Sequence, residues 1–479
     1  MKAALLRASL AATLSGALAL SAQDASAQIA VQNQGYIPFS DAPINYRSND
    51  LSDPVALLQK KLNANQASLA FDPTRGYLPS VLALLDIPVD SQTLVFSKTS
   101  FQYPKISPDH PRALYFNDDV YVGSVHDGKA VEIVSFDPTQ GAIFYLLDEH
   151  RADKPTFQRA ELDCTQCHIA AGTRGVPGVL LRSVYPTATG TTTNGARTYI
   201  TDQESPFKER WGGWYVTNDP LAAASHLGNK AVATPGSTPA AQTTTDASGA
   251  TLAALGKPYD DTAYLTPGSD AVALLVLAHQ TQMHNLITLT NYRTRIALYS
   301  PGSQPQGSQS ASGAATALAD LPDGVRNQIQ KPAEQLLRYL LFANEAALPA
   351  TDGASLIASS AFARSFAARG PRDARGRSLR DFDLGTHVFR YPCSYLIYSE
   401  AFDALPEPAK GYVYHRLLQV LSGEDQSSDF ARLTSADRRN VLEILLATKQ
   451  GLPQEWLDYQ RAHPAANSPS SVNSTRSPR

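Results

Sequence analysis

The pattern of apolar and polar positions divides the chain into a strand-forming part and a helix-forming part. Between residues 93 and 148, short runs rich in aromatic and β-branched residues are separated by turn signals such as Asn117-Asp118 and Asp127-Gly128. The runs cover residues 93–96, 113–116, 120–123, 131–134 and 142–146. Short runs of this kind, each followed by a turn, predict an antiparallel β meander.

Helical periodicity dominates the rest of the chain. Before the meander, residues 55–62 and 79–85 have helical spacing, and after residue 257 apolar faces recur every three to four positions. The later predicted helices cover about 268–298, 323–347, 354–368, 394–404, 408–422 and 434–449. The predicted fold class is therefore α+β, with an N-terminal antiparallel β meander followed by a largely helical C-terminal half.

Changes in composition along the chain mark the boundaries between its regions. Residues 28–228 form the β-rich region and residues 257–460 the helical region. Residues 229–256 are rich in Ala, Thr, Ser, Gly and Pro, and residues 300–315 in Gly, Ser and Gln, so both are predicted to be flexible loops. The Ser-, Pro- and Asn-rich residues 464–479 are predicted to be a disordered tail.

The first 27 residues have the order of features expected of a signal peptide. Lys2 and Arg7 are followed by an apolar stretch from Ala8 to Leu20, and Ala25-Ser26-Ala27 supplies a small-residue cleavage site. The alternative is an Ala-rich N-terminus without this role. We expect cleavage after Ala27 and a periplasmic location. No later segment reaches about 18 consecutive apolar residues, so no transmembrane segment is predicted.

Net charge and known catalytic motifs narrow the function. A formal charge of -3 gives no reason to expect nucleic acid or an anionic membrane as a partner. The sequence contains no nucleophile elbow, P-loop, dinucleotide-binding fingerprint or zinc-protease motif. No catalytic constellation can therefore be assigned, and whether the protein is an enzyme stays open.

The strongest chemical signal is Cys164-Thr165-Gln166-Cys167-His168, a C-x-x-C-H motif. Two thiols at this spacing can form thioethers with the vinyl groups of one porphyrin edge, and the adjacent His can then bind iron. A thioredoxin-like dithiol would be expected within a βαβ unit, and a zinc site would need a second pair of Cys or His nearby. Neither context is visible, and the third cysteine, Cys393, is predicted to be a buried thiol.

The pentapeptide resembles the attachment signature of c-type cytochromes. Longer segments, including residues 116–123, 211–216, 282–285 and 389–398, resemble a group of large bacterial cytochrome-like proteins whose role is uncertain. The resemblance implies one covalent haem c, attached through Cys164 and Cys167 with His168 as the proximal iron ligand, and electron transfer as the activity. The chain is much longer than a small single-domain cytochrome c, so that compact fold is not expected.

The distal ligand is less well defined by the sequence. Apart from Met1, the only Met is Met283, which would be the ligand of a His/Met haem. His279 and His284 lie on the same predicted helix and are alternatives, as is His226. Each of these residues could instead be structural, and a five-coordinate iron is a further possibility.

Two functional hypotheses follow. The first is an electron-transfer protein, and the alternative is a haem-dependent enzyme or sensor, peroxidase-like or gas-binding, with an open distal position. A redox partner protein could dock on an Arg-rich segment that could otherwise contact haem propionates or be a solvated loop. Its members are Arg364, Arg369, Arg372, Arg375, Arg377 and Arg380.

Other side chains could contact the haem. Arg174 and Arg182 follow the motif and are alternative propionate partners. Trp211 and Trp214 could pack on the porphyrin or in the core. The motif lies between the two parts of the chain, so the haem is expected at their junction.

Overall fold

The computed structural model describes residues 37–193, 196–217, 221, 226–228, 259–300 and 318–463. The predicted signal peptide, the loop at 229–256, nearly all of the loop at 300–315 and the tail at 464–479 lie outside the described residues.

An antiparallel sheet forms the N-terminal part, as the strand pattern predicted. Its six strands follow one another in chain order, each paired with the next. They are β1 (Thr93–Val95), β2 (Arg112–Phe116), β3 (Val120–Ser124), β4 (Ala130–Asp137), β5 (Gly141–Asp148) and β6 (Gln158–Arg159). The two-residue β6 was not predicted because it has no apolar alternation, and it extends the sheet only by pairing with β5.

The register of the sheet places side chains in rows on each face. Phe116, Tyr121, Val134 and Phe144 lie opposite one another across β2 to β5, and Leu114, Gly123, Glu132 and Leu146 form the neighbouring row. Because side chains two positions apart along a strand share a face, both rows lie on the same side of the sheet. This side carries the site described below.

Two short helices, α2 (Pro54–Asn63) and α3 (Leu78–Leu84), precede the sheet in sequence, and both were predicted. Asp53 is the N-cap of α2, where its carboxylate accepts hydrogen bonds from the backbone N–H groups of Val55 and Ala56. Its second oxygen accepts a 2.8 Å bond from the Tyr145 hydroxyl on β5, which ties the helix to the sheet.

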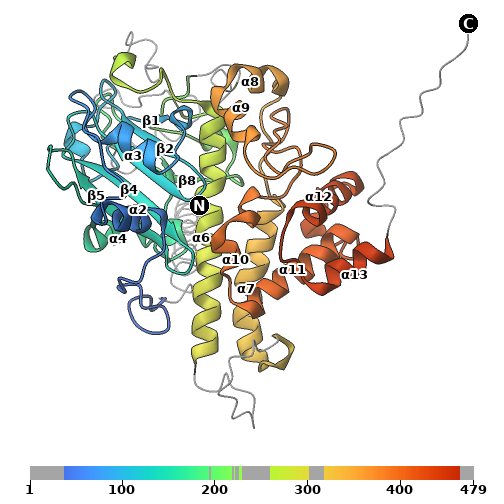
Figure 1. The fold of residues 1–479 in the computed structure, drawn as a ribbon. Helices are drawn as coiled ribbons and strands as arrows, with labels where there is room; N and C mark the ends of the chain where they lie inside the picture. Colours follow the sequence, from blue (N-terminus) through green and yellow to red (C-terminus); the bar gives the residue numbers. More distant parts are fainter. Residues whose placement is uncertain are drawn as a thin grey trace, which may run out of the picture.

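The helical part is organised around α6 (Ala271–Tyr299), which lies between the sheet and the C-terminal helices (Figure 1). Nearly every residue from Ala271 to Tyr292 is buried, and a helix that is buried all round belongs in a core. Asp270 caps its N-terminus through the backbone N–H groups of Val272 and Ala273. The helix α7 (Asp323–Leu340) packs against α6, and α11 (Glu407–Ser422) packs against α7.

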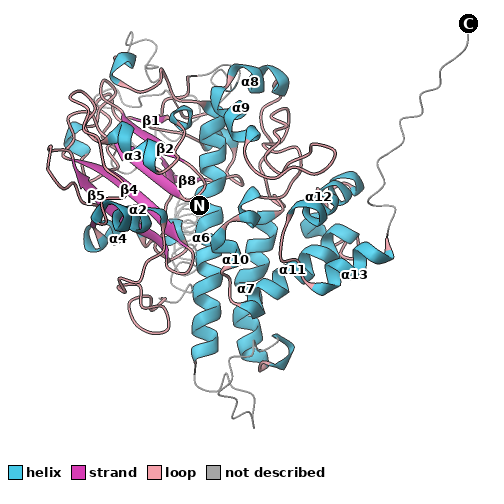
Figure 2. Ribbon diagram, in the orientation of Figure 1, coloured by secondary structure: helices cyan, strands magenta, loops and turns pink. Residues whose placement is uncertain are grey.

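The remaining helices confirm the predicted fold class, a sheet followed by a largely helical half (Figure 2). They are α8 (Gly353–Ser359), α9 (Ala361–Ala368), α10 (Glu400–Asp403), α12 (Ser435–Thr448) and α13 (Gln454–Ala462). The single helix predicted over 354–368 is interrupted at Ser360, whose hydroxyl donates to Asp270 at 2.7 Å and accepts from the N–H of Ala363. The segment predicted as helix at 394–404 begins instead with a 3-10 turn at Tyr395–Tyr398.

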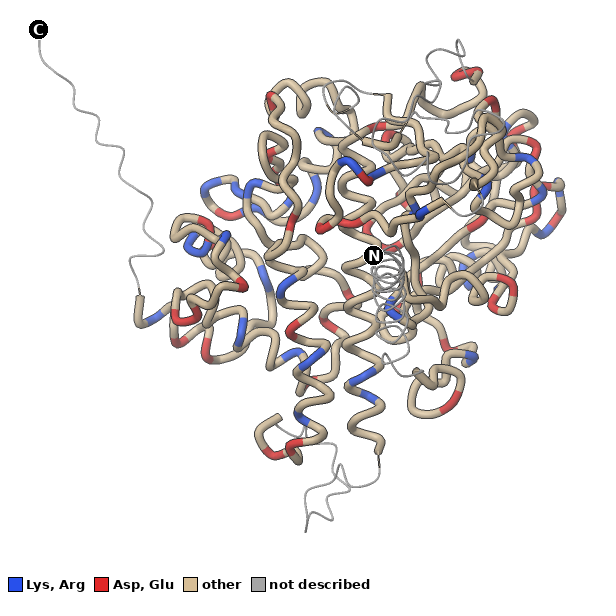
Figure 3. Tube along the Cα trace, turned by 180° about the vertical axis from the view of Figure 1, so that it is seen from behind, with Lys and Arg blue, Asp and Glu red and all other residues tan. Residues whose placement is uncertain are grey.

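A large apolar core joins the two parts. A continuous cluster of buried side chains extends from Ile37 to Trp456 and includes residues of the sheet, α6 and the C-terminal helices. Lys and Arg positions are interspersed with Asp and Glu positions along the described part of the chain trace (Figure 3). Within the described ranges, no helix is long and apolar enough to cross a membrane.

Candidate functional site

The C-x-x-C-H motif lies on a short helix, α4 (Glu161–His168), between β6 and the two-stranded sheet of β7 (Leu181–Ser183) and β8 (Tyr199–Thr201). Cys164, Cys167 and His168 are three and four positions apart, so a helical turn brings their side chains to one side of α4. α4 packs against β5, and the rings of His168 and Phe144 are 5.0 Å apart.

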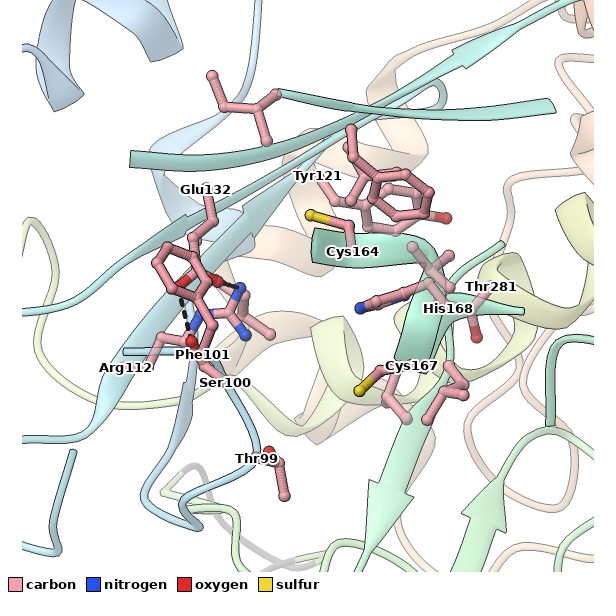
Figure 4. Close-up of a pocket in the computed structure, with 18 of the residues that line it drawn as sticks. Thr99, Ser100, Phe101, Arg112, Tyr121, Glu132, Cys164, Cys167, His168 and Thr281 are labelled. Atoms are coloured by element: carbon pink, nitrogen blue, oxygen red, sulfur yellow. Dashed lines mark hydrogen bonds and ion pairs between the residues drawn. The ribbon is translucent and has the colours of Figure 1, made fainter. Parts of the chain in front are cut away.

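All three motif side chains line one cavity of about 360 Å³. Figure 4 shows the two sulfurs and the His168 ring on the side formed by α4, with Arg112, Glu132, Ser100 and Phe101 on the facing side. Leu277 and Thr281 of α6 also line the cavity, so it lies where the sheet meets the helical part. Small-molecule sites typically have volumes of about 300–1,000 Å³, a range that includes this cavity.

The lining has an apolar part and a polar part, as a haem requires. The two rows of sheet side chains are mostly apolar, and further apolar walls come from residues 179–181 and Trp214. The polar lining side chains come from residues 98–100, from Arg112 and Glu132 on the sheet, and from Asp163 on α4. A macrocycle with two carboxylates has the same division between apolar ring and charged edge, so the cavity fits the group that the motif implies.

His168 is oriented by its backbone neighbours. Its Nδ1 is 2.8 Å from the carbonyl oxygen of Gly178, and the backbone N–H of Gly178 donates to the carbonyl of His168 at 3.0 Å. Burial lowers the pKa of His168, so the ring is neutral and Nδ1 carries the proton that Gly178 accepts. Nε2 then presents its lone pair to the cavity, which is the arrangement of a metal-binding histidine whose second nitrogen is fixed.

Gly178 is held in turn by α6. The side chain of Asn285 accepts from the N–H of Val179 at 3.2 Å and donates to its carbonyl at 2.8 Å. A Cβ on Gly178 would lie 2.1 Å from Asn285 Oδ1, so only glycine allows this approach. The orientation of His168 therefore depends on a helix more than a hundred positions away in the chain.

The alternative uses of the two cysteines are disfavoured. Both thiols are free, and burial raises the pKa of Cys164 to about 11, with Glu132 and Asp163 adding to the shift. A reactive dithiol needs a lowered thiol pKa instead. In the part of the chain that is described, no three His, Cys, Asp or Glu side chains gather as a metal site. A zinc centre needs such a group of ligands, so it is disfavoured.

Met283, the predicted distal ligand, is not at the cavity. Leu277 and Thr281 of α6 line it, and Met283 is two positions beyond Thr281. Two positions correspond to about 200° of rotation around a helix, so Met283 points to the opposite side. It is fully buried in the core. The ligand role of Met283 stays a prediction, and this arrangement does not favour it.

His279 shares the face of Met283, and both of its ring nitrogens have partners. Nδ1 is 2.5 Å from Gln203 Oε1, and Nε2 is 2.7 Å from the Ser394 hydroxyl. Burial lowers the pKa of His279 to about 3, so it is neutral, donating to Gln203 and accepting from Ser394.

The other two histidines are also outside the cavity lining. His284 Nδ1 is 3.0 Å from the hydroxyl of Tyr121, and the ring stacks on Phe136. His226 is buried against Trp211, with ring centroids 5.3 Å apart. Among the described residues that line the cavity, His168 is the only His and there is no Met.

Of the tryptophans and arginines predicted to contact the haem, some line the cavity and others do not. Trp214 lines the cavity and donates from Nε1 to the carbonyl of Arg182, whereas Trp211 is packed in the core. Arg174 donates to Gln282, and neither Arg174 nor Arg182 lines the cavity. Cys393 is fully buried, as expected.

The Arg-rich segment is largely neutralised by acidic neighbours. Arg372 pairs with Asp381, Arg380 with Asp118, and both Arg375 and Arg377 with Glu443. The segment therefore presents less free positive charge than its composition indicated.

The residues facing His168 were not predicted from the sequence. Arg112 and Glu132 lie in separate strands, twenty positions apart, and no motif marks them. The only available signal was that two charged residues interrupt strands that are otherwise apolar. Comparisons with family models, curated proteins and solved structures found no match to this chain.

Proposed function

We propose that this chain is a single-haem c-type protein, with the haem attached through Cys164 and Cys167 and bound on its proximal side by His168. The observation that supports it is the convergence of both sulfurs and the His168 ring on one amphipathic cavity. The Nδ1 contact with Gly178 supports it further, because it leaves Nε2 free to bind iron. When bound, the haem supplies an iron that exchanges single electrons, so electron transfer is the first proposed role.

A second role is an enzyme or sensor with an open distal position. It is favoured by the described cavity lining, in which no Met and no second His accompanies His168. For Met283 to be the sixth ligand, its side chain would have to turn from the core side of α6 to the cavity side. Of the two roles, the geometry supports the open position better.

Covalent attachment is tested by producing the chain in a periplasm with haem-attachment machinery and measuring its intact mass. We expect one haem per chain, retained after denaturation, and loss of the haem mass in a Cys164→Ala/Cys167→Ala variant. Cys393→Ala is the matched control because Cys393 is buried away from the cavity, and it should keep the haem. A wild-type chain without haem, or a double variant that retains it covalently, would refute the proposal.

The optical spectra of the ferric and ferrous forms separate the two roles. A high-spin spectrum with ready binding of carbon monoxide supports the open position. A thioether-to-iron charge-transfer band that disappears in Met283→Ala supports Met283 as the distal ligand. It then favours electron transfer over the enzyme or sensor role.

Export to the periplasm and a redox partner protein belong to the same proposal. The N-terminal residue of the purified protein tests export, with Gln28 expected after cleavage. If the partner docks on the Arg-rich segment, charge reversal of the exposed Arg364 should slow its reaction with the haem protein and reduce the salt dependence.

A further inference from the structure

The wall of the cavity that faces His168 carries an ion pair between Arg112 on β2 and Glu132 on β4. The strand β3 lies between them, and the two side chains meet above it at Gly123, which pairs with Glu132. A Cβ at Gly123 would lie 2.3 Å from Arg112 Nη2 and 2.7 Å from Nε. The guanidinium therefore rests directly on the glycine, and a side chain at this position would displace it.

Glu132 is fixed by three donors. Besides Arg112, the Ser100 hydroxyl donates to Oε1 at 2.6 Å, and Gln102 Nε2 donates to the same oxygen at 2.8 Å. Gln102 is itself held, because its Oε1 accepts from the backbone N–H of Lys129 at 2.7 Å. The carboxylate thus holds the guanidinium in one orientation.

Arg112 has more donors than partners. A guanidinium carries five N–H groups. Within the described residues, Glu132 is its ion-pair partner, and Nε is buried without a hydrogen-bond partner. The Arg112 side chain is only 19% exposed and lines the cavity, so the donors that Glu132 does not satisfy lie at the cavity wall. Buried donors without acceptors are costly, and a ligand with an accepting atom would relieve that cost.

The direction of His168 relates this pair to the iron site. Figure 4 shows the His168 ring pointing across the cavity toward the side of Arg112, Glu132 and Ser100, with the sulfurs of Cys164 and Cys167 to either side. Since Nδ1 is bonded to Gly178, Nε2 is the nitrogen that faces this wall. The Arg112–Glu132 pair therefore lies on the far side of the space that a haem bound to His168 would occupy.

We propose that Arg112, held by Glu132 and Gly123, forms a binding site for a small inorganic ligand with a hydrogen-bond-accepting atom, such as fluoride or azide, on the face opposite His168. This inference rests on the proposed haem attachment. Arg112 donates to the ligand, and Glu132 is a positioning residue that acts through Arg112. Lys98 and Asp163 also line the cavity, so its charged lining residues are two cations and two anions.

The test is an optical titration of the full-length haem-loaded protein with fluoride and with azide. Arg112→Leu should weaken binding about 10- to 100-fold, which is the loss of one hydrogen bond from a charged donor. Arg112→Lys should retain part of the affinity. Arg182→Leu, an exposed arginine on β7 outside the cavity lining, is the control and should bind as the wild type does.

Gly123→Ala provides a second variant that keeps the arginine. The added methyl displaces the guanidinium without removing its charge, so binding should weaken as in Arg112→Leu. Intact mass and circular dichroism of each variant establish that haem attachment and fold are retained.

The outcomes are distinguishable. A wild type without covalent haem refutes the proposed function and this inference together. A haem-loaded wild type that binds neither ligand refutes the inference alone, as does equal affinity in wild type, Arg112→Leu and Gly123→Ala. If Arg112→Leu instead changes only the pH dependence of the reduction potential, Arg112 contacts a haem propionate and the inference is wrong.

Discussion

The contact between Gly178 and Asn285 gives a sharp test of how α6 supports the site. Gly178→Ala would place a methyl carbon 2.1 Å from Asn285 Oδ1, whereas ordinary contacts begin at 3.4 Å. The side chain of Asn285 must therefore retreat by more than about 1 Å, which breaks its two hydrogen bonds to Val179. Overpacking costs about 1–3 kcal/mol and each buried hydrogen bond about 1 kcal/mol. With one overpacked contact and two lost hydrogen bonds, we expect the free energy of unfolding to fall by about 3–5 kcal/mol.

A double-mutant cycle isolates this contact from general damage. Asn285→Ala alone loses the same two hydrogen bonds and should cost a similar amount. In that background the obstructing oxygen is gone, so adding Gly178→Ala should cost less than about 1 kcal/mol. The free energy of unfolding of the wild type, the two single variants and the double variant is measured on the haem-free chain by urea unfolding, monitored by circular dichroism.

The control is Gly324→Ala, at an exposed position in the first turn of α7 with nothing near the added methyl. It should be neutral or slightly stabilising, because Ala has the higher helix propensity. If the costs of Gly178→Ala and Asn285→Ala simply add, the methyl does not act through Asn285, and the argument for a helix-supported His168 fails.

Three further predictions concern buried residues of α6 and of the strand β3. His279 has a pKa of about 3 when folded, so an unfolded His279 takes up a proton first, and stability is lost as pH falls below about 6.5. His279→Gln should remove up to about 1.4 kcal/mol per pH unit from that slope, and equal slopes in urea titrations between pH 7 and 5 would contradict its burial as a neutral group. Tyr121→Phe removes the partner of His284 Nδ1 and one of the two acceptors of Gln280 Nε2, so it should cost about 1–3 kcal/mol, whereas the exposed Tyr299→Phe should cost nothing measurable. Met283→Leu conserves core volume, so it should cost less than about 1.5 kcal/mol and leave the haem spectrum unchanged; an altered spectrum would place Met283 on the iron.

Much of the fold could be predicted because its elements carry local patterns. The strands from β1 to β5 and the helices α6, α11 and α12 have strong periodicity and agree closely with their predicted ranges. The failures are elements without such a signal. The helix predicted over 354–368 is interrupted at Ser360, whose hydroxyl donates a hydrogen bond to Asp270, ninety positions away in the chain.

The candidate site also has a part that could be predicted from the sequence and a part that could not. The C-x-x-C-H motif could be recognised because the chemistry of attachment requires three residues close together in the chain. The position of Met283 could not be derived, because its periodicity shows only that it shares a face with His279. Which face of α6 meets the cavity depends on how the helix packs against the sheet.

By itself, the sequence determined the order of strands and helices and the presence of one C-x-x-C-H motif, because local periodicity and short-range spacing encode both. Tertiary structure alone decided what faces that motif. Arg112, Gly123 and Glu132 come together through strand register, and Asn285 reaches Gly178 through the packing of α6. Such contacts join residues far apart in the chain, and their energies depend on a geometry that no local pattern records.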